Sequence, residues 1–481
     1  MKIFKNIITL LTVFLFTACS KDFLNRVPED QLSSEAYYQN LPQLEKGIIG
    51  CYVPLQNFYN GGNVAWTLGL ISDEFSPWKN QSNVAVAFNI DAFTKNLTFS
   101  QAGIWSNAYV NIQRCNRMIQ VIEAGDFTVI HGEEALLKSY LGEAKFIRAL
   151  NYFILVQLYG DVPMVTKAYE DPNEAVGIGR TPVSKIYSDI IIPDFKFAGE
   201  NCRLRNQLAA NQLGRITSGA GYTMLGKVYL TLKNYPEAES ALKKVIDSQQ
   251  YILLPQLASI FDVKNENNQE SIFEIQYDET LEDGSTYQRW VGYEAAPLVG
   301  TQGSNESIWV SDKLIAQYKA TNDLVRLNTW IVESVINPAN NLPIKDPFPK
   351  KLITLNTGLL NQNNNFIVTR YADVVLMYAE ALVMQSPARA SEIINEFNKI
   401  RTRASMPILT AAQLTQSVIL NERKMELAFE GHRWFDLLRT GTAITVMGAE
   451  LNKIIPATQL LFPVPTGEIQ KDPSLIQNVG Y

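Results

Sequence analysis

The sequence predicts a mostly α-helical protein, in which tetratricopeptide-like helical hairpins form the scaffold and a loop-rich insertion carries short strands. Three stretches lead to this prediction, because apolar residues recur in them at the spacing of one helix face: 134–159, 225–245 and 370–403. The last two stretches each contain two helices joined by a short turn. Such hairpins bury their apolar faces against neighbouring hairpins, so we expect a stacked, solenoid-like core.

The first stretch is a single long helix. Its apolar face consists of Leu137, Tyr140, Leu141, Ala144, Ile147 and Leu150. Gly160 and Pro163 follow, and both residue types commonly end helices.

The second stretch predicts two helices in close contact. Residues at the offsets of a tetratricopeptide repeat are Leu225, Gly226 and Tyr229 on the first helix and Ala238, Leu242 and Val245 on the second. The small Gly226 and Ala238 stand where such repeats bring two helices together. Pro236 fits the first turn of the second helix, because a backbone N–H there has no intrahelical partner.

The third stretch repeats this arrangement. Its apolar residues are Ala372, Leu376, Ala379 and Leu382, followed after Pro387 by Ala390, Ile393, Ile394 and Phe397. Between the second and third stretches, residues 252–365 mix Gly, Asn, Pro and Asp with strand-like pieces such as Ser271 to Tyr277, which predicts a loop-rich insertion. Asn361 and Asn363 to Asn365 are expected to form an exposed turn, and the Pro- and Gly-rich tail 456–481 to wrap the core.

The N-terminus has the layout of a lipoprotein signal. Lys2 and Lys5 precede an apolar run, Ile7 to Ala18, that is shorter than the roughly 20 residues needed to span a bilayer. Cleavage before Cys19 would leave a cysteine for acylation, and more than one acyl chain makes membrane attachment stable. A plain secretory signal with an accidental cysteine is the alternative. We therefore expect a signal peptide at 1–18, a lipidated tether at 19–34 and a single folded unit at 35–481, with parts at 35–250, 251–365 and 366–481.

Charge and composition exclude several functions. The formal charge of −6 includes the two signal lysines, so the exported chain carries −6 − 2 = −8 and repels nucleic acid. The chain has only two histidines, His131 and His432, which leaves little for a histidine-rich metal site or a Ser/His triad. No metal or cofactor is expected.

Cys51, Cys115 and Cys202 are interpreted as buried small hydrophobes, with an isolated disulfide as the alternative.

Aromatic residues in polar loops are the candidate ligand contacts, because an exposed aromatic ring offers an apolar face on which a ligand can stack. Trp78 precedes the polar run 79–83, and Trp309 lies near Asn305 and Glu306. The remaining candidates follow the polar run 283–285: Tyr287, Arg289, Trp290 and Tyr293. A packing role is the alternative for each of them, and Trp105 and Trp434 are assigned to the core.

A dense group of charged residues near the C-terminus could suggest catalysis, because glycosidases use two carboxylates about 5 to 10 Å apart. The group comprises Glu422, Arg423, Glu426, Glu430, Arg433, Asp436 and Arg439. Acids and arginines alternate here at steps of three and four, which favours structural ion pairs along a helix. His432 and Trp434 are interpreted as packing residues, and Asp73 and Glu74 as residues that position the loop after them.

Four blocks of the sequence together resemble the SusD/RagB family of outer-membrane glycan-binding lipoproteins. They are EAKFIRALNYF at 143–153 with YGDVP at 159–163, RYAD at 370–373 with YAEA at 378–381, NERKMEL at 421–427 with EGHRWFDLLR at 430–439, and FPVP at 462–465 with QN at 477–478. The resemblance runs from Cys19 to Tyr481.

The resemblance implies four tetratricopeptide-like units, the fourth near 104–122. It also implies a surface location on the outer membrane and a SusC-like TonB-dependent transporter as partner, to which a captured oligo- or polysaccharide is delivered without catalysis or cofactor. Capture of peptides or other nutrients is one alternative, and a helical glycoside hydrolase is another.

Overall fold

The structure, a computed structural model, describes residues 37–60, 64–77, 91, 93, 100–125, 133–281, 284–287, 308–336, 340–345, 347–354 and 362–481. The predicted signal peptide and tether lie outside these ranges. Within them the protein is mostly helical, as the sequence predicts, and the strands are short and paired two by two.

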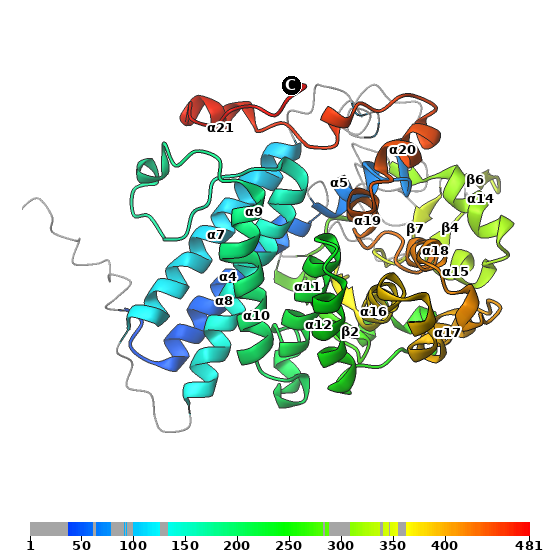
Figure 1. Cartoon of the computed structure of the whole chain (residues 1–481), viewed down its shortest axis with the longest axis horizontal. Coiled ribbons are helices and arrows are strands. Elements are labelled where there is room, and N and C mark those ends of the chain that lie inside the picture. The colour runs from blue at the N-terminus through cyan, green and yellow to red at the C-terminus, as the bar shows by residue number, and fades with distance from the viewer. Residues whose placement is uncertain are drawn as a thin grey trace, which may run out of the picture.

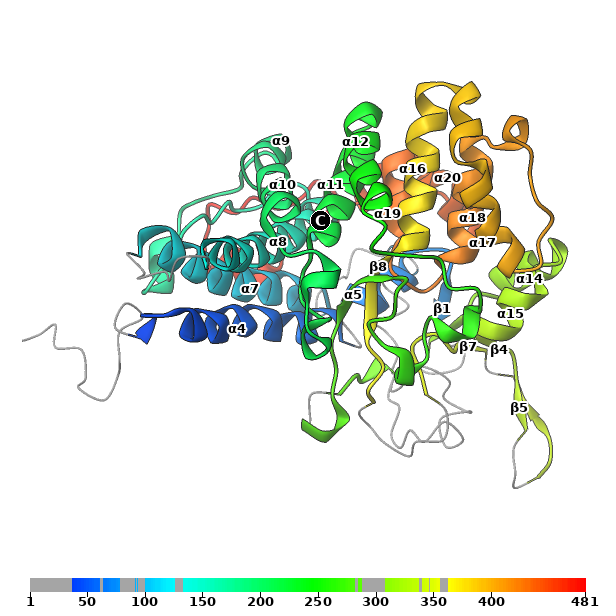
Figure 2. The ribbon, with the colours of Figure 1, turned by 90° about the horizontal axis from the view of Figure 1, so that it is seen from below.

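Helices of the N-terminal half lie alongside one another (Figures 1 and 2). They are α4 (Leu41–Tyr59), α7 (Ser100–Ala124), α8 (Glu134–Tyr159), α10 (Ile192–Asn201), α11 (Ser218–Thr231) and α12 (Tyr235–Asp247). Neighbours along the chain pack together as α7 with α8, α10 with α11, and α11 with α12. The hairpin expected near 104–122 is therefore present as α7 and α8.

The α11–α12 hairpin has the close approach predicted at Gly226. A Cβ atom at this position would lie 2.5 Å from Cγ of Leu242, so only glycine fits without a shift of Leu242. Thr217 caps α11 by accepting a hydrogen bond from the backbone N–H of Ala220 at 3.2 Å. Pro236 lies in the first turn of α12, as expected.

The C-terminal helices continue the stack through α16 (Tyr371–Gln385), which packs against α12 and is buried over most of its length. The third predicted hairpin is formed by α16 and α17 (Ile394–Arg403), with a 3₁₀ turn at Pro387–Glu392 between them. Beyond it lie α18 (Gln416–Glu426), α19 (Arg433–Thr440) and α20 (Ala443–Leu451).

The predicted insertion contains more regular structure than the sequence indicates. Strand β2 (Ser271–Ile275) lies within the expected strand and pairs antiparallel with β8 (Phe366–Arg370). Two helices were not predicted: α14 (Asp312–Ala320) and α15 (Leu324–Trp330). Ser311 caps α14 through its side chain, a start signal that the sequence carries.

Three further strand pairs surround these helices. They are β1 (Phe75–Pro77) with β3 (Ile308–Val310), β4 (Ile331–Val332) with β7 (Phe348–Pro349), and β5 (Val335–Ile336) with β6 (Pro343–Ile344). The β5–β6 pair projects from the body of the molecule (Figure 2).

The prediction of an exposed turn at Asn363 to Asn365 is wrong for two residues, since Asn364 and Asn365 are buried. Their side chains serve as internal hydrogen-bond partners. Asn365 Oδ1 accepts from the backbone N–H of Tyr277 at 2.8 Å, and Asn364 Oδ1 accepts from Thr354 Oγ1 at 3.0 Å. Asparagine favours turns for the same reason that it satisfies irregular backbone inside a protein, so composition alone does not separate the two cases.

The tail lies against the core and contains one short helix, α21 (Thr466–Lys471), before the chain ends at Tyr481. Phe462 and Val464 are fully buried. Gln477 holds Val464 by bonding both its N–H and its C=O, and Asn478 Nδ2 donates to the backbone oxygen of Tyr159 at 2.9 Å. The first and fourth sequence blocks thus meet at the end of α8.

Cys51, Cys115 and Cys202 are buried and free, as expected for small hydrophobes. Trp105 and Trp434 lie in the core, which confirms their assignment. Across the residues described, no helix has the length and apolar character required to cross a membrane.

Candidate functional site

The β1–β3 pair forms a small platform at which one candidate aromatic residue is displayed. Phe75 pairs with Val310, Ser76 with Trp309, and Pro77 with Ile308. Alternate residues of a strand point to opposite faces, and on β3 Ile308 and Val310 are fully buried while Trp309 is only half-buried. Trp309 therefore belongs to the outer face of the platform.

The inner face of the platform is fixed to the core. The Phe75 ring stacks on that of Phe429 with centroids 5.1 Å apart, and α5 (Val64–Leu70) lies directly beneath. The backbone N–H of Ser311 donates to the Glu74 carbonyl at 2.9 Å. This support makes the platform a rigid base for whatever its outer face contacts.

The register of the platform also defines where two candidate loops attach. The chain leaves β1 after Pro77 and enters β3 at Ile308, and these two residues are paired. Trp78 follows Pro77 directly, while the segment that contains Arg289, Trp290 and Tyr293 leads into Ile308. Those four candidates lie outside the described residues.

Tyr287 is placed differently from the exposed aromatic that the sequence suggests. It is only 3% exposed, and its hydroxyl has no hydrogen-bond partner among the described groups. The preceding residues hold it in place, because Ser285 bridges to Gln362 and the Thr286 N–H donates to Asn60 Oδ1 at 2.8 Å. In this structure Tyr287 belongs to the core at the base of its loop.

The two acids just before β1, Asp73 and Glu74, have pKa values that are shifted in opposite directions. Burial opposes ionisation of Asp73, but the hydrogen bond and charge of Arg433 at 2.7 Å, together with Lys424, lower its pKa to about 2. Burial, and then the neighbouring charge of Asp73, raise the pKa of Glu74 to about 8. Asp73 therefore anchors the turn to α19, which supports its predicted structural role, and Glu74 is protonated at neutral pH.

The C-terminal charged group is a buried ion-pair network, as the structural interpretation predicts. Arg370 is at its centre and bonds Glu270, Glu426 and Glu430 at 2.7 to 2.9 Å. A second set joins Arg423 and Arg439 to Asp436 at 2.8 Å. Most partners come from different elements and not from one helix, so the network connects α16, α18, α19, β8 and Glu270, the residue before β2.

This network leaves no carboxylate pair for glycoside hydrolysis. Glu422 and Glu426 are 2% and 0% exposed, and both bond Arg326. A pair of catalytic acids must face a sugar from a solvent-filled cleft, which these side chains do not reach.

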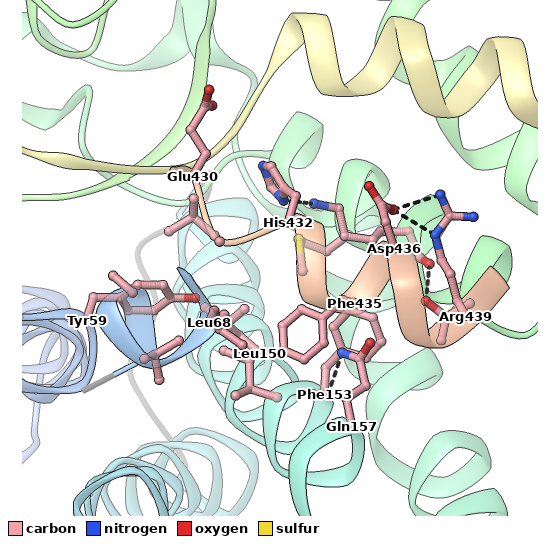
Figure 3. Close-up of a pocket in the computed structure, with 18 of the residues that line it drawn as sticks. Tyr59, Leu68, Leu150, Phe153, Gln157, Glu430, His432, Phe435, Asp436 and Arg439 are labelled. Carbon is pink, nitrogen blue, oxygen red and sulfur yellow. Dashed lines mark hydrogen bonds and ion pairs between the residues drawn. The ribbon is translucent and has the colours of Figure 1, made fainter. Parts of the chain in front are cut away.

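Figure 3 shows residues that line a cavity beside the network. The cavity holds about 60 Å³ and lies between α8, α11 and α19, with Asp436 and Arg439 paired at one edge. Ligand pockets are several times larger, whereas this volume suits a few water molecules.

His432 at the cavity wall is a packing residue, as predicted. Burial, and then the charge of Lys227, lower its pKa to about 4. Lys227 Nζ donates to Nδ1 of the ring at 3.1 Å, which requires neutral histidine. Within the described part of the chain, no group of three or more His, Cys, Asp or Glu residues could hold a metal ion.

A larger hollow between α4 and β2 is lined by groups that already bond one another. It holds about 540 Å³. Arg215 donates to Glu143 at 3.0 Å, the Tyr52 hydroxyl donates to the same carboxylate at 2.6 Å, and Gln56 Nε2 donates to the Gln276 carbonyl at 2.9 Å. The platform, with its half-buried tryptophan and the attachment of two segments that contain further candidates, is the better place for a ligand site.

Comparison with protein families finds two matching models. One, described as the SusD family, matches residues 325–481, and the other, described as starch-binding associating with outer membrane, matches residues 22–230. Together they cover both helical halves of the chain.

Individual proteins are similar over nearly the whole length. SusD-like protein P2 of Formosa agariphila is 26% identical over 98% of each chain. A solved structure named laminarin binding SusD-like protein is 26% identical, with a TM-score of 0.80 over 92% of this chain and 100% of that one. Surface glycan-binding protein A from Bacteroides thetaiotaomicron, in complex with laminarihexaose, shares the fold at 20% identity, with a TM-score of 0.76 over 91% and 99% of the two chains.

Proposed function

Because the chain belongs to the SusD/RagB family, we propose that it is a surface lipoprotein that captures a glycan and delivers it to a SusC-like TonB-dependent transporter. The family description names starch binding and the outer membrane. The names of two similar structures specify laminarin and laminarihexaose. These relatives support a glycan as the ligand class of this chain.

The platform is the observation that carries the proposal. A half-buried Trp309 stands on the outer face of a rigid strand pair, and the segments of Trp78 and of Trp290 attach at one end of that pair. Tryptophan faces that converge from two loops would give a stacking surface for sugar rings, with Arg289 and loop amides bonding hydroxyl groups. Tyr293 is the fourth candidate in these segments, and the buried Tyr287 is not proposed as a ligand contact.

Capture without cleavage is part of this proposal. The acidic groups of the described core are used in ion pairs or buried, as with Glu426 and Glu74. Affinity would come from a preformed aromatic surface. The transporter would supply the energy for uptake.

Membrane attachment is proposed through acylation of Cys19. A Cys19→Ser variant should leave the outer-membrane fraction when cells are fractionated, while the wild-type chain stays there. Release of both proteins, or of neither, would contradict the proposed anchor.

Calorimetric titration tests glycan capture. The chain from Ser20 onward is titrated with laminarin and other plant, host and microbial glycans, and each mixture is then analysed for shortened products. We expect one glycan to bind uncleaved and Trp78→Ala, Trp290→Ala or Trp309→Ala to weaken it. Tyr229→Ala, which removes a half-buried tyrosine from α11, is the control. Degradation of the glycan would favour a hydrolase, and no binding across the panel would favour capture of peptides or other nutrients.

A further inference from the structure

A second surface groove runs along α7, on the flank opposite the platform. Its first half is an apolar hollow of about 560 Å³ between α7, the segment 163–176 and the α21 region. Tyr109, Pro163 and Leu475 contribute to its wall. Val110 and Val176 are 50% and 48% exposed, so the groove leaves apolar surface in contact with water.

The second half of the groove is cationic. A hollow of about 420 Å³ is lined by Lys46, Arg114 and Arg117 together with the rings of Tyr37 and Tyr38. Lys46 and Arg114 are exposed. One carboxylate opposes them, because Glu170 pairs with Arg117 at 2.6 Å while being 81% exposed itself. This half therefore carries 3 − 1 = +2, whereas Glu468, Lys471 and Asp472, which line the first half, add 1 − 2 = −1.

The two halves form one groove, because Gln113 and Arg114 line both hollows. Figure 1 shows α21 near one end of α7 and the start of α4 towards the other. The side-chain amide of Gln113 is already bonded at both ends, to the backbone C=O and N–H of Tyr169. The amide of Gln113 is therefore not available to a sugar hydroxyl.

We propose that this groove binds one anionic membrane lipid, with the headgroup against Lys46 and Arg114 and an acyl chain in the apolar half. The contact of apolar and cationic hollows matches an amphiphile, whereas a free anion would leave the apolar half unused. The point where the chain enters the fold supports a lipid as the occupant. Tyr37 lines the groove and follows Cys19 by 37 − 19 = 18 residues, a tether of at most about 60 Å. This last step rests on the proposed lipid anchor, which would keep a membrane within reach.

Soluble short-chain lipids test the proposal without a membrane. The unacylated chain from Ser20 onward is titrated with monomeric dihexanoylphosphatidylglycerol, with dihexanoylphosphatidylcholine and with inorganic phosphate. We expect the phosphatidylglycerol to bind at least about tenfold more tightly than either of the others, because each cation near an anionic lipid contributes about 1 kcal/mol.

Substitutions test the cationic and the apolar half of the groove separately. Lys46→Glu with Arg114→Glu should weaken phosphatidylglycerol at least about tenfold. Val110→Asn should weaken the lipid and leave phosphate unchanged. The control is Lys196→Glu with Lys399→Glu, which makes the same charge change at side chains 60% and 63% exposed on α10 and α17, and should have no effect.

Three results would overturn the proposal: no binding of phosphatidylglycerol, phosphate binding as tightly as the lipid, or equal losses in the control pair. The second would indicate a free-anion site, and the third a general charge effect. Glycan titration of the same variants keeps this test separate from the proposed function, because the groove variants should bind glycan normally.

Discussion

The buried ion-pair network and the β1–β3 platform differ in burial and in the role that we assign to them. The network connects elements of the fold, and the platform is the proposed ligand surface. Arg370 at the centre of the network is 0% exposed, and its partners come from the residue before β2, from α18 and from the turn before α19. Trp309 on the platform is half-buried, and the chain segments that contain Trp78 and Trp290 join the platform at Pro77 and Ile308. The second and third sequence blocks that suggested the family form the network, while the platform contains none of the four. Residues that identify the family therefore build the scaffold, whereas the proposed ligand contacts follow no motif.

The largest effect should come from breaking the network. Arg370→Met leaves buried glutamates without their central partner, and removing one member of a buried pair costs about 3 to 5 kcal/mol. Arg389→Met is the control, since Arg389 pairs with Glu239 and Glu392 but is 29% exposed and should contribute about 1 kcal/mol or less. Denaturant unfolding measures both. Equal losses would mean that the network has no special role.

A pH-dependent effect should distinguish Glu74 from Asp73. Burial raises the pKa of Glu74 to about 8, above its unfolded value of about 4.3. The folded state keeps a proton that the unfolded state loses, so this group's stabilising contribution falls between these two pH values, by up to about 1.4 kcal/mol per pH unit. Glu74→Gln should remove that decline and unfold at higher denaturant than wild type at pH 8, with little difference at pH 4.

Asp73 should behave in the opposite way. Burial opposes its ionisation, yet Arg433 lowers the pKa of Asp73 to about 2, so its contribution is present above about pH 4 and is lost as the pH falls towards 2. Asp73→Asn should therefore destabilise at pH 7 and converge with wild type near pH 2. Parallel pH profiles for the two variants would contradict the assigned charges.

A smaller change in stability is expected for substitutions in the helical hairpins. Gly226→Ala places a Cβ atom 2.5 Å from Leu242 and should cost about 1 to 3 kcal/mol. Gly50→Ala lies in α4, where a Cβ atom meets nothing within 4 Å, and should stabilise by up to about 1 kcal/mol. Shifts of the same sign in the unfolding midpoint would show that Gly226 is not a packing requirement.

The smallest stability change is expected on the platform. Trp309→Ala should lower the free energy of unfolding by only about 1 kcal/mol, because the residue lies on the outer face, yet reduce glycan affinity about tenfold. Comparing its unfolding curve with its titration separates the two quantities. A large loss of stability with unchanged affinity would make Trp309 a structural residue.

The helical scaffold could be predicted because its signals are local. Apolar spacing located the main hairpins, and Gly226 indicated where two helices meet. Helices α14 and α15 were missed because each is short, although Ser311 before α14 is a recognisable cap. The prediction for Asn364 and Asn365 was wrong because turn-forming residues can also bond groups inside the protein, here a threonine hydroxyl and a backbone N–H.

The network and the site are harder to predict, since both depend on distant residues. Spacing suggested ion pairs within one helix, but Arg370 bonds Glu426 and Glu270 at separations of 56 and 100 residues. Tyr287 and Trp309 stand in similar polar contexts in the sequence, yet one is buried and the other half-exposed. The burial of each residue depends on how its segment pairs with a distant one, and such pairing leaves no periodic pattern in the sequence.

Hydroxyl-radical footprinting with a saturating bound glycan most directly tests the claim that the ligand sits on the platform. The account predicts slower oxidation of Trp309, with unchanged rates for Tyr229 on α11 and Tyr169 in the α7 groove. Unchanged oxidation of Trp309 together with protection of Tyr52, at the hollow between α4 and β2, would move the glycan site away from the platform and contradict the account.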